Sequence, residues 1–223
     1  MIMASPSKKS RRGTTRSFIL ILCFSFISSS QLLSQACHDV DRSALLGFKA
    51  QITNDNGNLK TWNTSSTDCC TWDHINCDST GRVIKLEIPG VFRGPVEVLD
   101  ADGVPVPEKT SMNGTLSPTL GNLSSLQYLE LSELQGLEGP IPPELGNLQQ
   151  LTFLNLSGNR LNGSIPSSLG NLINLETLFL SDNQLSGVVP SSIPSLKKLT
   201  ITYFSGNQLT GDIPPRIIVH EDN

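Results

Sequence analysis

The sequence predicts an α/β solenoid: a right-handed superhelix of stacked repeats, with a parallel β-sheet on its concave side and a small helical cap at its N-terminal end. Three observations lead to this fold class. Apolar residues recur with a fixed period, they alternate with polar residues inside each period, and four cysteines cluster ahead of the repeats. A period of this kind marks repeats that bury their apolar faces against neighbouring copies.

The period is clearest between Asn147 and Ile193, where one set of residues recurs 24 positions later. The first set is Leu148, Leu151, Leu154, Leu156, Asn159, Leu161, Gly163, Ile165, Pro166 and Leu169; the second is Leu172, Leu175, Leu178, Leu180, Asn183, Leu185, Gly187, Val189, Pro190 and Ile193. In Leu-x-x-Leu-x-Leu the last two leucines alternate with outward positions, which is typical of a strand with one buried face. Each repeat should therefore supply one strand.

Residues 1–36 predict a secretory signal peptide. Basic residues from Lys8 to Arg16 precede an apolar run from Phe18 to Ile27, and small residues then lead to a cleavage site at Ala36. That order is typical of export signals. The alternative is a membrane anchor, but the run is about half of the roughly 20 residues that span a bilayer. No later stretch predicts a membrane span.

Removal of this leader would make the chain more acidic. The leader contains five of the 16 basic residues and none of the 20 acidic ones, which leaves 11 basic residues against 20 acidic ones, a net charge of −9. Binding to a phosphate backbone depends on clustered Lys and Arg side chains. We therefore expect an exported protein that binds no nucleic acid.

Four cysteines follow the leader, and an even number in an exported chain indicates disulfides. Three pairings are possible, and a bond between the adjacent Cys69 and Cys70 would be strained. We expect the pairs Cys37–Cys69 and Cys70–Cys77. The alternative is a metal site that includes His74, which an oxidising compartment disfavours. We expect no metal and no cofactor.

Residues 37–81 are expected to form a small disulfide-stapled cap. Asp39 or Asp41 could cap a helix there, and turn residues from Asn54 would end it. The apolar side of this helix is Leu45, Leu46, Phe48 and Ile52. Trp62 and Trp72 are expected in the core, because a unit this small needs such groups to fold.

The motifs of this chain resemble those of plant leucine-rich-repeat proteins. The cap carries Asp41-Arg-Ser-Ala-Leu-Leu-Gly-Phe-Lys49, Trp62, Asp68-Cys-Cys-Thr-Trp72 and Asn76-Cys-Asp78, and the repeats carry Leu-x-Gly-x-Ile-Pro. Polygalacturonase-inhibiting proteins are similar, as are the secreted proteins labelled DNA-damage-repair/toleration proteins. The resemblance covers nearly everything after the leader, and it implies a leucine-rich-repeat solenoid in an extracellular plant protein.

Residues 82–217 are expected to hold about five repeats. The first strand is predicted at Val83 to Ile88, and about 19 extra residues then delay the return of the pattern at Met112. This insertion, residues 89–111, would leave the solenoid as a loop. It either contacts a ligand or is a tolerated excursion.

Later positions also depart from the repeat. The loop at 132–139 has one extra residue and lacks the expected Asn, and Thr202 occupies a leucine position, which would weaken that layer of the core. After Ile217 the pattern stops in an irregular tail, residues 218–223. Solenoids need a polar terminal cap, but Arg216-Ile-Ile-Val-His220 offers an apolar edge and no capping cysteines. We therefore expect a truncated gene product or pairing through this edge.

Strand positions between the leucines are the candidates for ligand binding, because they point outward from the concave sheet. They are Lys85, Glu87, Tyr128, Glu130, Phe153, Asn155, Thr177, Phe179, Ile201 and Tyr203, with Ser132, Ser157, Ser181 and Ser205 just after the strands. Aromatic residues on four neighbouring strands favour a protein-binding face. The alternative is that aromatic residues simply suit half-buried strands.

Asparagines carry two further predictions. Asn159, Asn183 and Asn207 recur just after the strands, where each amide should bond backbone groups that the turn leaves unpaired. Five Asn-x-Ser/Thr sequons predict glycosylation in an exported protein, and they start at Asn63, Asn113, Asn122, Asn155 and Asn162. A glycan on Asn155 would cover part of the proposed binding face.

The sequence contains no arrangement typical of an enzyme, since His38, His74 and His220 accompany no nucleophile motif. We predict a secreted binding module of the apoplast or cell wall, with a role in defence. Its expected partner is a protein or peptide, such as a microbial polygalacturonase or a receptor ectodomain. The alternative is the ectodomain of a receptor-like protein or receptor kinase. The leader and the acidic charge disfavour a direct role in DNA-damage tolerance.

Overall fold

The computed structural model describes residues 36–90 and 111–211, which belong to one compact unit. The predictions for the leader, for most of the 89–111 insertion and for everything after residue 211 lie outside the described residues. No helix in the described ranges is long and apolar enough to cross a membrane.

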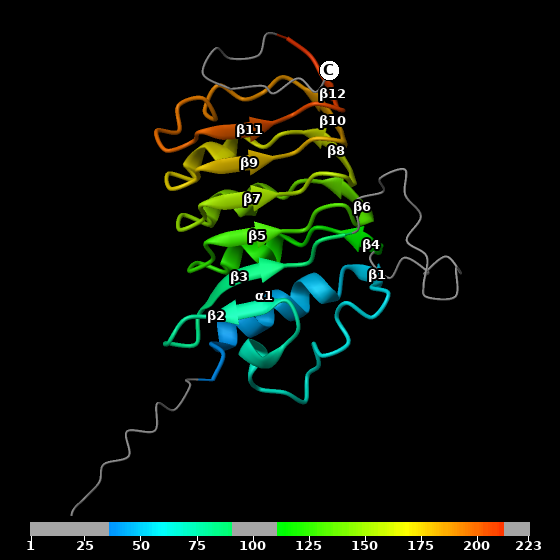
Figure 1. Ribbon diagram of the computed structural model, residues 1–223, viewed down its shortest axis with the longest axis vertical. Helices are drawn as coiled ribbons and strands as arrows, with labels where there is room; N and C mark the ends of the chain where they lie inside the picture. Colours follow the sequence, from blue (N-terminus) through cyan, green and yellow to red (C-terminus); the bar gives the residue numbers. More distant parts are fainter. Residues whose placement is uncertain (1–35, 91–110, 212–223) are drawn as a thin grey trace, which may run out of the picture. The chain divides into compact units, whose positions relative to one another are not determined.

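One six-stranded sheet, here called the front sheet, is the sheet predicted to be concave. Its strand order is β11-β9-β7-β5-β3-β2. The strands are β2 (Ile75–Cys77), β3 (Val83–Glu87), β5 (Tyr128–Glu130), β7 (Phe153–Asn155), β9 (Thr177–Phe179) and β11 (Ile201–Tyr203). Strands β3 to β11 pair in parallel, one from each repeat, and Figure 1 shows them stacked in sequence order. The predicted strand in each repeat is therefore present.

A second six-stranded sheet, here called the back sheet, is absent from the sequence-based prediction. Its order is β1-β4-β6-β8-β10-β12. The strands are β1 (Ile52–Asn54), β4 (Met112–Thr115), β6 (Gln135–Pro140), β8 (Arg160–Ser164), β10 (Gln184–Gly187) and β12 (Gln208–Leu209). The back-sheet strands β4, β6, β8 and β10 each contain the glycine of a Leu-x-Gly-x-Ile-Pro segment or its equivalent. One of these, Gly163, has a φ of 75°. Because glycine weakens a strand pattern, the sequence does not predict a strand in this segment.

Short 3-10 helices close the repeats between the two sheets. After η1 (Cys69–Thr71) of the cap they are η2 (Pro118–Asn122), η3 (Pro143–Asn147) and η4 (Ser167–Asn171). A Cβ atom at Gly146 would clash with the backbone carbonyl of Ser168 in the next helix, so glycine lets adjacent repeats approach. All leucines from Leu123 to Leu185 are completely buried, and each contributes roughly 2 kcal/mol of apolar burial.

The extra residue in the 132–139 loop is absorbed without loss of the core. Glu133 and Gln135 adopt positive φ values of 56° and 58°, and Leu134 between them is buried. The segment still forms β6, which pairs in parallel with β4 and β8. The irregular loop therefore changes the turn and leaves the stack intact.

The cap helix α1 (Asp39–Lys49) corrects two predictions. Its N-cap is His38, with no side-chain capping bond, so neither Asp39 nor Asp41 caps it; Asp41 is buried and pairs with Arg82 instead. Ile52 lies outside the helix, because it pairs with Gly114 as the start of β1. The prediction for the tryptophans is confirmed: Trp62 and Trp72 are buried and stacked, with ring centroids 5.6 Å apart.

The cap also covers one edge of each sheet. β2 pairs antiparallel with β3 at the front, and β1 pairs antiparallel with β4 at the back. Exposed sheet edges leave backbone donors and acceptors open to other chains. A single cap therefore satisfies the N-terminal edges of both sheets, and Figure 1 shows α1 and β2 beside β3 at this end of the stack.

Candidate binding face

The predicted ligand-binding residues lie on the front sheet in two rows that cross the strands. Row one is Lys85, Tyr128, Phe153, Thr177 and Ile201, and row two is Glu87, Glu130, Asn155, Phe179 and Tyr203. Because side chains alternate along a strand, both rows share the face opposite the leucine core. All ten side chains are half-buried except Ile201, which is 42% exposed.

Four aromatic rings form one connected chain across this face. Tyr128 and Phe153 stack in row one, with ring centroids 4.3 Å apart. Phe153 contacts Phe179 edge-on at 5.7 Å, and Phe179 contacts Tyr203 edge-on at 4.9 Å. The chain therefore changes from row one to row two between β7 and β9. Ring contacts of this kind add about 0.5–1.5 kcal/mol each, so the rings are held in place by one another.

Glu130 is the centre of a hydrogen-bond network beside these rings. Its carboxylate accepts from the Tyr128 hydroxyl at 2.6 Å, from the Ser132 hydroxyl at 3.1 Å and from the Asn155 amide at 3.2 Å. Burial, followed by the hydrogen bond to Glu130, raises the pKa of Tyr128 well above its ordinary value. Tyr128 therefore remains a protonated donor at physiological pH.

Lys85 connects a charged pair to the aromatic chain. Its ammonium lies 2.6 Å from the Glu87 carboxylate and 4.6 Å from the centroid of the Tyr128 ring. A cation over an aromatic face is attracted by the ring quadrupole. The aromatic chain thus begins at a charged group on β3.

Two carboxylates border the face just after the strands, and sequence reasoning missed both. Glu133 and Asp182 both have positive φ, as does Gly158 at the equivalent position of the repeat between them. A Cβ atom at Gly158 would meet the Glu133 carboxylate, so glycine leaves room for that side chain. Burial, and then repulsion from Asp182, raise the pKa of Glu133. Within residues 36–90 and 111–211 neither carboxylate forms an ion pair.

The three repeated asparagines form a ladder beneath this border. The Asn183 amide donates to the carbonyls of Leu156, Leu180 and Ser181, and its oxygen accepts from the Leu161 N–H at 3.0 Å. Asn207 makes the equivalent contacts in the next repeat. These are bonds to backbone groups at the turn, the role expected from the sequence.

Asn159 makes three of the four equivalent contacts and lacks the one to its side-chain oxygen. Its amide donates to three carbonyls, between 2.7 and 3.1 Å. Its buried oxygen has no partner in the described part of the chain. The N–H group equivalent to that of Leu161 would belong to the preceding repeat, and that part of the preceding repeat is the irregular 132–139 loop. The ladder therefore begins with one unsatisfied acceptor.

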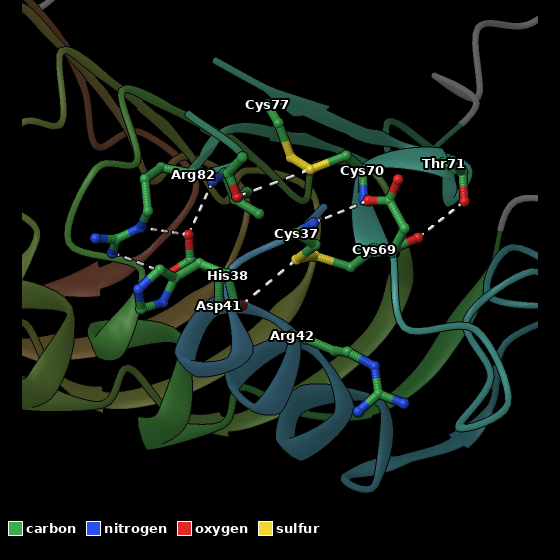
Figure 2. Close-up of a disulfide and its surroundings, with 12 residues drawn as sticks. Cys37, His38, Asp41, Arg42, Cys69, Cys70, Thr71, Cys77 and Arg82 are labelled. Carbon is green, nitrogen blue, oxygen red and sulfur yellow. Dashed lines mark hydrogen bonds and ion pairs between the residues drawn. A yellow bond between two sulfur atoms is a disulfide. The ribbon is translucent and has the colours of Figure 1, made fainter. Parts of the chain in front are cut away.

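The cap cysteines form the two expected disulfides. Cys37 pairs with Cys69 and Cys70 with Cys77, with Cα atoms 5.1 and 5.6 Å apart, and Figure 2 shows the two bonds side by side. The Asp68 carboxylate accepts from the backbone N–H groups of Cys37 and Cys70, both at 3.0 Å. The sulfurs of Cys37, Cys69 and Cys70 lie within 4.8 Å of one another, but all are used in disulfides and offer no thiolate to a metal.

The five sequon asparagines differ in their surroundings. Asn63, Asn113, Asn122 and Asn162 are exposed, and Asn155 is half-buried on the front sheet. Asn155 donates to Glu130, and its oxygen accepts from the Ser157 N–H at 3.1 Å. Whether any of the five carries a glycan stays a prediction.

Residues 38–78 match the family model of the leucine rich repeat N-terminal domain, and residues 149–209 match the leucine rich repeat model. The chain belongs to the plant leucine-rich-repeat proteins with this N-terminal cap. The family predicted from the motifs is thereby confirmed, as is the solenoid fold with its disulfide-stapled cap.

Particular relatives place the chain within this family. Polygalacturonase inhibitor 1 of Oryza sativa subsp. japonica is 32% identical over 131 residues, which is 54% of this chain and 38% of that protein. The crystal structure of a plant ice-binding protein matches with 33% identity and a TM-score of 0.67, over 82% of this chain and 53% of that one. A chain of the BIR3–SERK2 complex from Arabidopsis thaliana matches with 31% identity and a TM-score of 0.64, over 78% of this chain and 85% of that one.

The match to the curated relatives is partial in length. It spans between 9% and 40% of the length of those proteins.

Proposed function

We propose that the chain is an extracellular binding module that holds a protein or peptide ligand against its front sheet. The connected chain of four half-buried rings carries the proposal. Aromatic side chains are enriched among the residues that dominate binding energy. Because these rings already contact one another, they lose little conformational freedom when a ligand covers them. The two disulfides support an oxidising, extracellular location.

The charges around the rings favour a ligand segment that combines cationic and apolar side chains. Glu133 and Asp182 border the face without an ion-pair partner among the described residues, and Glu130 lies beside the rings. A Lys or Arg of the ligand would meet this acidic border while an apolar side chain packs on Phe153 and Phe179. Complementary charges of this kind speed association and set specificity.

The finer function that we propose is inhibition of a microbial polygalacturonase, as part of defence at the cell wall. Its support is the similarity to the rice protein named as a polygalacturonase inhibitor, together with the motifs of the cap and repeats. The function proposed for this aromatic and acidic surface is binding and not catalysis.

The test uses the purified chain and a fungal endo-polygalacturonase. Affinity is measured by biolayer interferometry and inhibition by release of reducing ends. The combined variant Phe153→Ala, Phe179→Ala and Tyr203→Ala should lose about 30-fold in affinity or more, which corresponds to at least about 2 kcal/mol.

The matched control changes three exposed side chains of the back sheet, Arg160→Ala, Gln184→Ala and Gln208→Ala, and should bind as the parent does. Unchanged affinity of the aromatic variant would show that the front sheet is not the binding face. If the parent chain does not bind the enzyme at all, the inhibitor function is wrong.

A second candidate is a receptor-complex ectodomain that pairs with another leucine-rich-repeat ectodomain. The match that covers 85% of a chain in the BIR3–SERK2 complex favours it. Titration of the purified chain with the SERK2 ectodomain in a calorimeter would detect such pairing. Heat of binding there, with no effect on polygalacturonase, would favour the second candidate over the first.

A further inference from the structure

The sequons fall differently on the two sheets. Asn113 in β4 and Asn162 in β8 occupy the same position of their repeats, directly after a buried core residue, Met112 or Leu161. Both are exposed on the back sheet, with β6 between them. Asn155 is the sequon of the front sheet. The same three-residue signal therefore occurs in two structural settings.

We propose that N-linked glycans on Asn113 and Asn162 cover the back sheet, and that Asn155 stays unmodified, so that the front sheet remains bare. The inference requires export of the chain and does not depend on the identity of any ligand.

The chemistry of glycan attachment determines which atoms of each asparagine must be accessible. The side-chain amide nitrogen bonds to the anomeric carbon of a polyprenyl-diphosphate-linked oligosaccharide. The bond from that carbon to the diphosphate oxygen breaks, the lipid diphosphate leaves, and the amide loses one proton. The asparagine and the Ser or Thr two positions later must both be free to enter the transferase.

Asn155 and its partner Ser157 are both engaged in the folded sheet. The Asn155 amide nitrogen donates to Glu130 and its oxygen accepts from the Ser157 N–H. Ser157 is 8% exposed, and its hydroxyl accepts from the Ser181 hydroxyl at 3.1 Å. Strand pairing places Glu130 on one side of Asn155 and Phe179 on the other. A first sugar there would separate these neighbours.

Transfer of the glycan competes with folding while the chain is being synthesised and exported. Front-sheet contacts join residues about one repeat apart, and contacts this local form early. Asn155 therefore becomes inaccessible to the transferase soon after the next repeat has been synthesised and can pack against it. Asn113 and Asn162 remain exposed after folding, so that folding does not close either site.

The open space around Asn113 and Asn162 on the back sheet supports the proposal that these two residues are glycosylated. Asn162 has no side-chain hydrogen bond to any described residue, and Gly163 beside it has no side chain to obstruct a sugar. Gly136 lies opposite Asn113 in the register of β4 and β6. A Cβ atom at Gly136 would clash with the Asn113 side chain, so glycine leaves that amide its space.

The experiment is a site map of the full chain secreted from plant or insect cells. Peptide N-glycosidase in heavy-oxygen water converts each glycosylated asparagine to a labelled aspartate, which peptide mass spectrometry locates. We expect label at Asn113 and Asn162 and an unlabelled peptide at Asn155. Asn113→Gln and Asn162→Gln should each remove one glycan from the intact mass, and Asn155→Gln should remove none.

The matched control is Ser164→Ala, which destroys the sequon and keeps Asn162 itself; it should remove the same glycan as Asn162→Gln. A labelled Asn155 peptide, or the absence of label at either Asn113 or Asn162, would overturn the proposal. These outcomes are separate from the binding test, because the aromatic variants leave all five sequons in place. A wrong glycan map with intact front-sheet binding is therefore distinguishable from a correct map without binding.

Discussion

Asp41, buried in the cap helix, holds Arg82 at the start of the first repeat strand. Arg82 donates from Nε and Nη2 to the two carboxylate oxygens at 2.9 and 3.0 Å, and the Val83 N–H donates to the same carboxylate at 2.9 Å. The bond to Asp41 raises the pKa of Arg82, and Figure 2 shows the pair beside the disulfides. One side chain thus joins the cap to the solenoid.

Loss of this carboxylate should be costly, because it would leave the Arg82 guanidinium without its partner and the Val83 N–H unsatisfied. We expect Asp41→Ala to lower the free energy of unfolding by about 3 kcal/mol, measured by urea titration. Asp39→Ala, two residues away and exposed, is the control and should change it by less than about 0.5 kcal/mol. Equal effects of the two substitutions would show that the Asp41–Arg82 pair makes no specific contribution to the free energy of unfolding.

The asparagine ladder predicts that alanine substitutions at two equivalent positions lower the free energy of unfolding by different amounts. Asn183→Ala leaves three carbonyls and the Leu161 N–H without partners, whereas Asn159→Ala leaves only carbonyls. Because an unsatisfied buried backbone group costs about 1–3 kcal/mol, Asn183→Ala should destabilise the chain by about 1 kcal/mol more than Asn159→Ala. The same urea titration would reveal the difference, and a larger loss at Asn159 would contradict the role of the Leu161 contact.

Thr202 predicts a stabilising substitution. It replaces a leucine of the repeat in β11 and is 2% exposed, and its hydroxyl has no partner in the described ranges. Thr202→Val keeps the shape and removes the unpaired hydroxyl, so the free energy of unfolding should rise by about 1 kcal/mol. Thr177→Val, on the half-buried outward side of β9, is the control and should have little effect. A less stable Thr202→Val would mean that the hydroxyl is satisfied in solution.

Glu133 predicts a pH-dependent effect. Its folded pKa is raised above the ordinary value of 4.5 by burial and by Asp182. The folded state therefore holds the proton more tightly than the unfolded state, and stability is lost as pH rises through the folded pKa. Glu133→Gln should raise the thermal midpoint at neutral pH and leave it unchanged at a pH below 4.5. Glu138→Gln, on the exposed side of β6, should show no such difference, and a Glu133→Gln effect that is equal at both pH values would exclude this origin.

The outward rows of the front sheet could be predicted because strand side chains alternate with a period of two and the repeat has a constant length. Tyr128, Phe153, Phe179 and Tyr203 could therefore be assigned to one face. The contacts between the rings could not be predicted, because they depend on the orientation of each side chain. The back sheet was missed for a different reason: a glycine in mid-strand weakens the pattern of Leu-x-Gly-x-Ile-Pro, and the sheet exists only through pairing with neighbouring copies.

By itself the sequence determined the solenoid, its leucine core and the asparagine positions, because each of these depends on local periodicity or on residue type. For the cysteines it excluded only the adjacent pair Cys69–Cys70, and the structure shows which of the two remaining pairings is formed. Tertiary structure alone decided the partner of Asp41, the acidic border of Glu133 and Asp182 and the engagement of Asn155 by Glu130. The repeat period assigns these residues to a face or a turn, but it does not specify which side chains meet. That depends on how the cap and the repeats pack and on how each side chain is oriented.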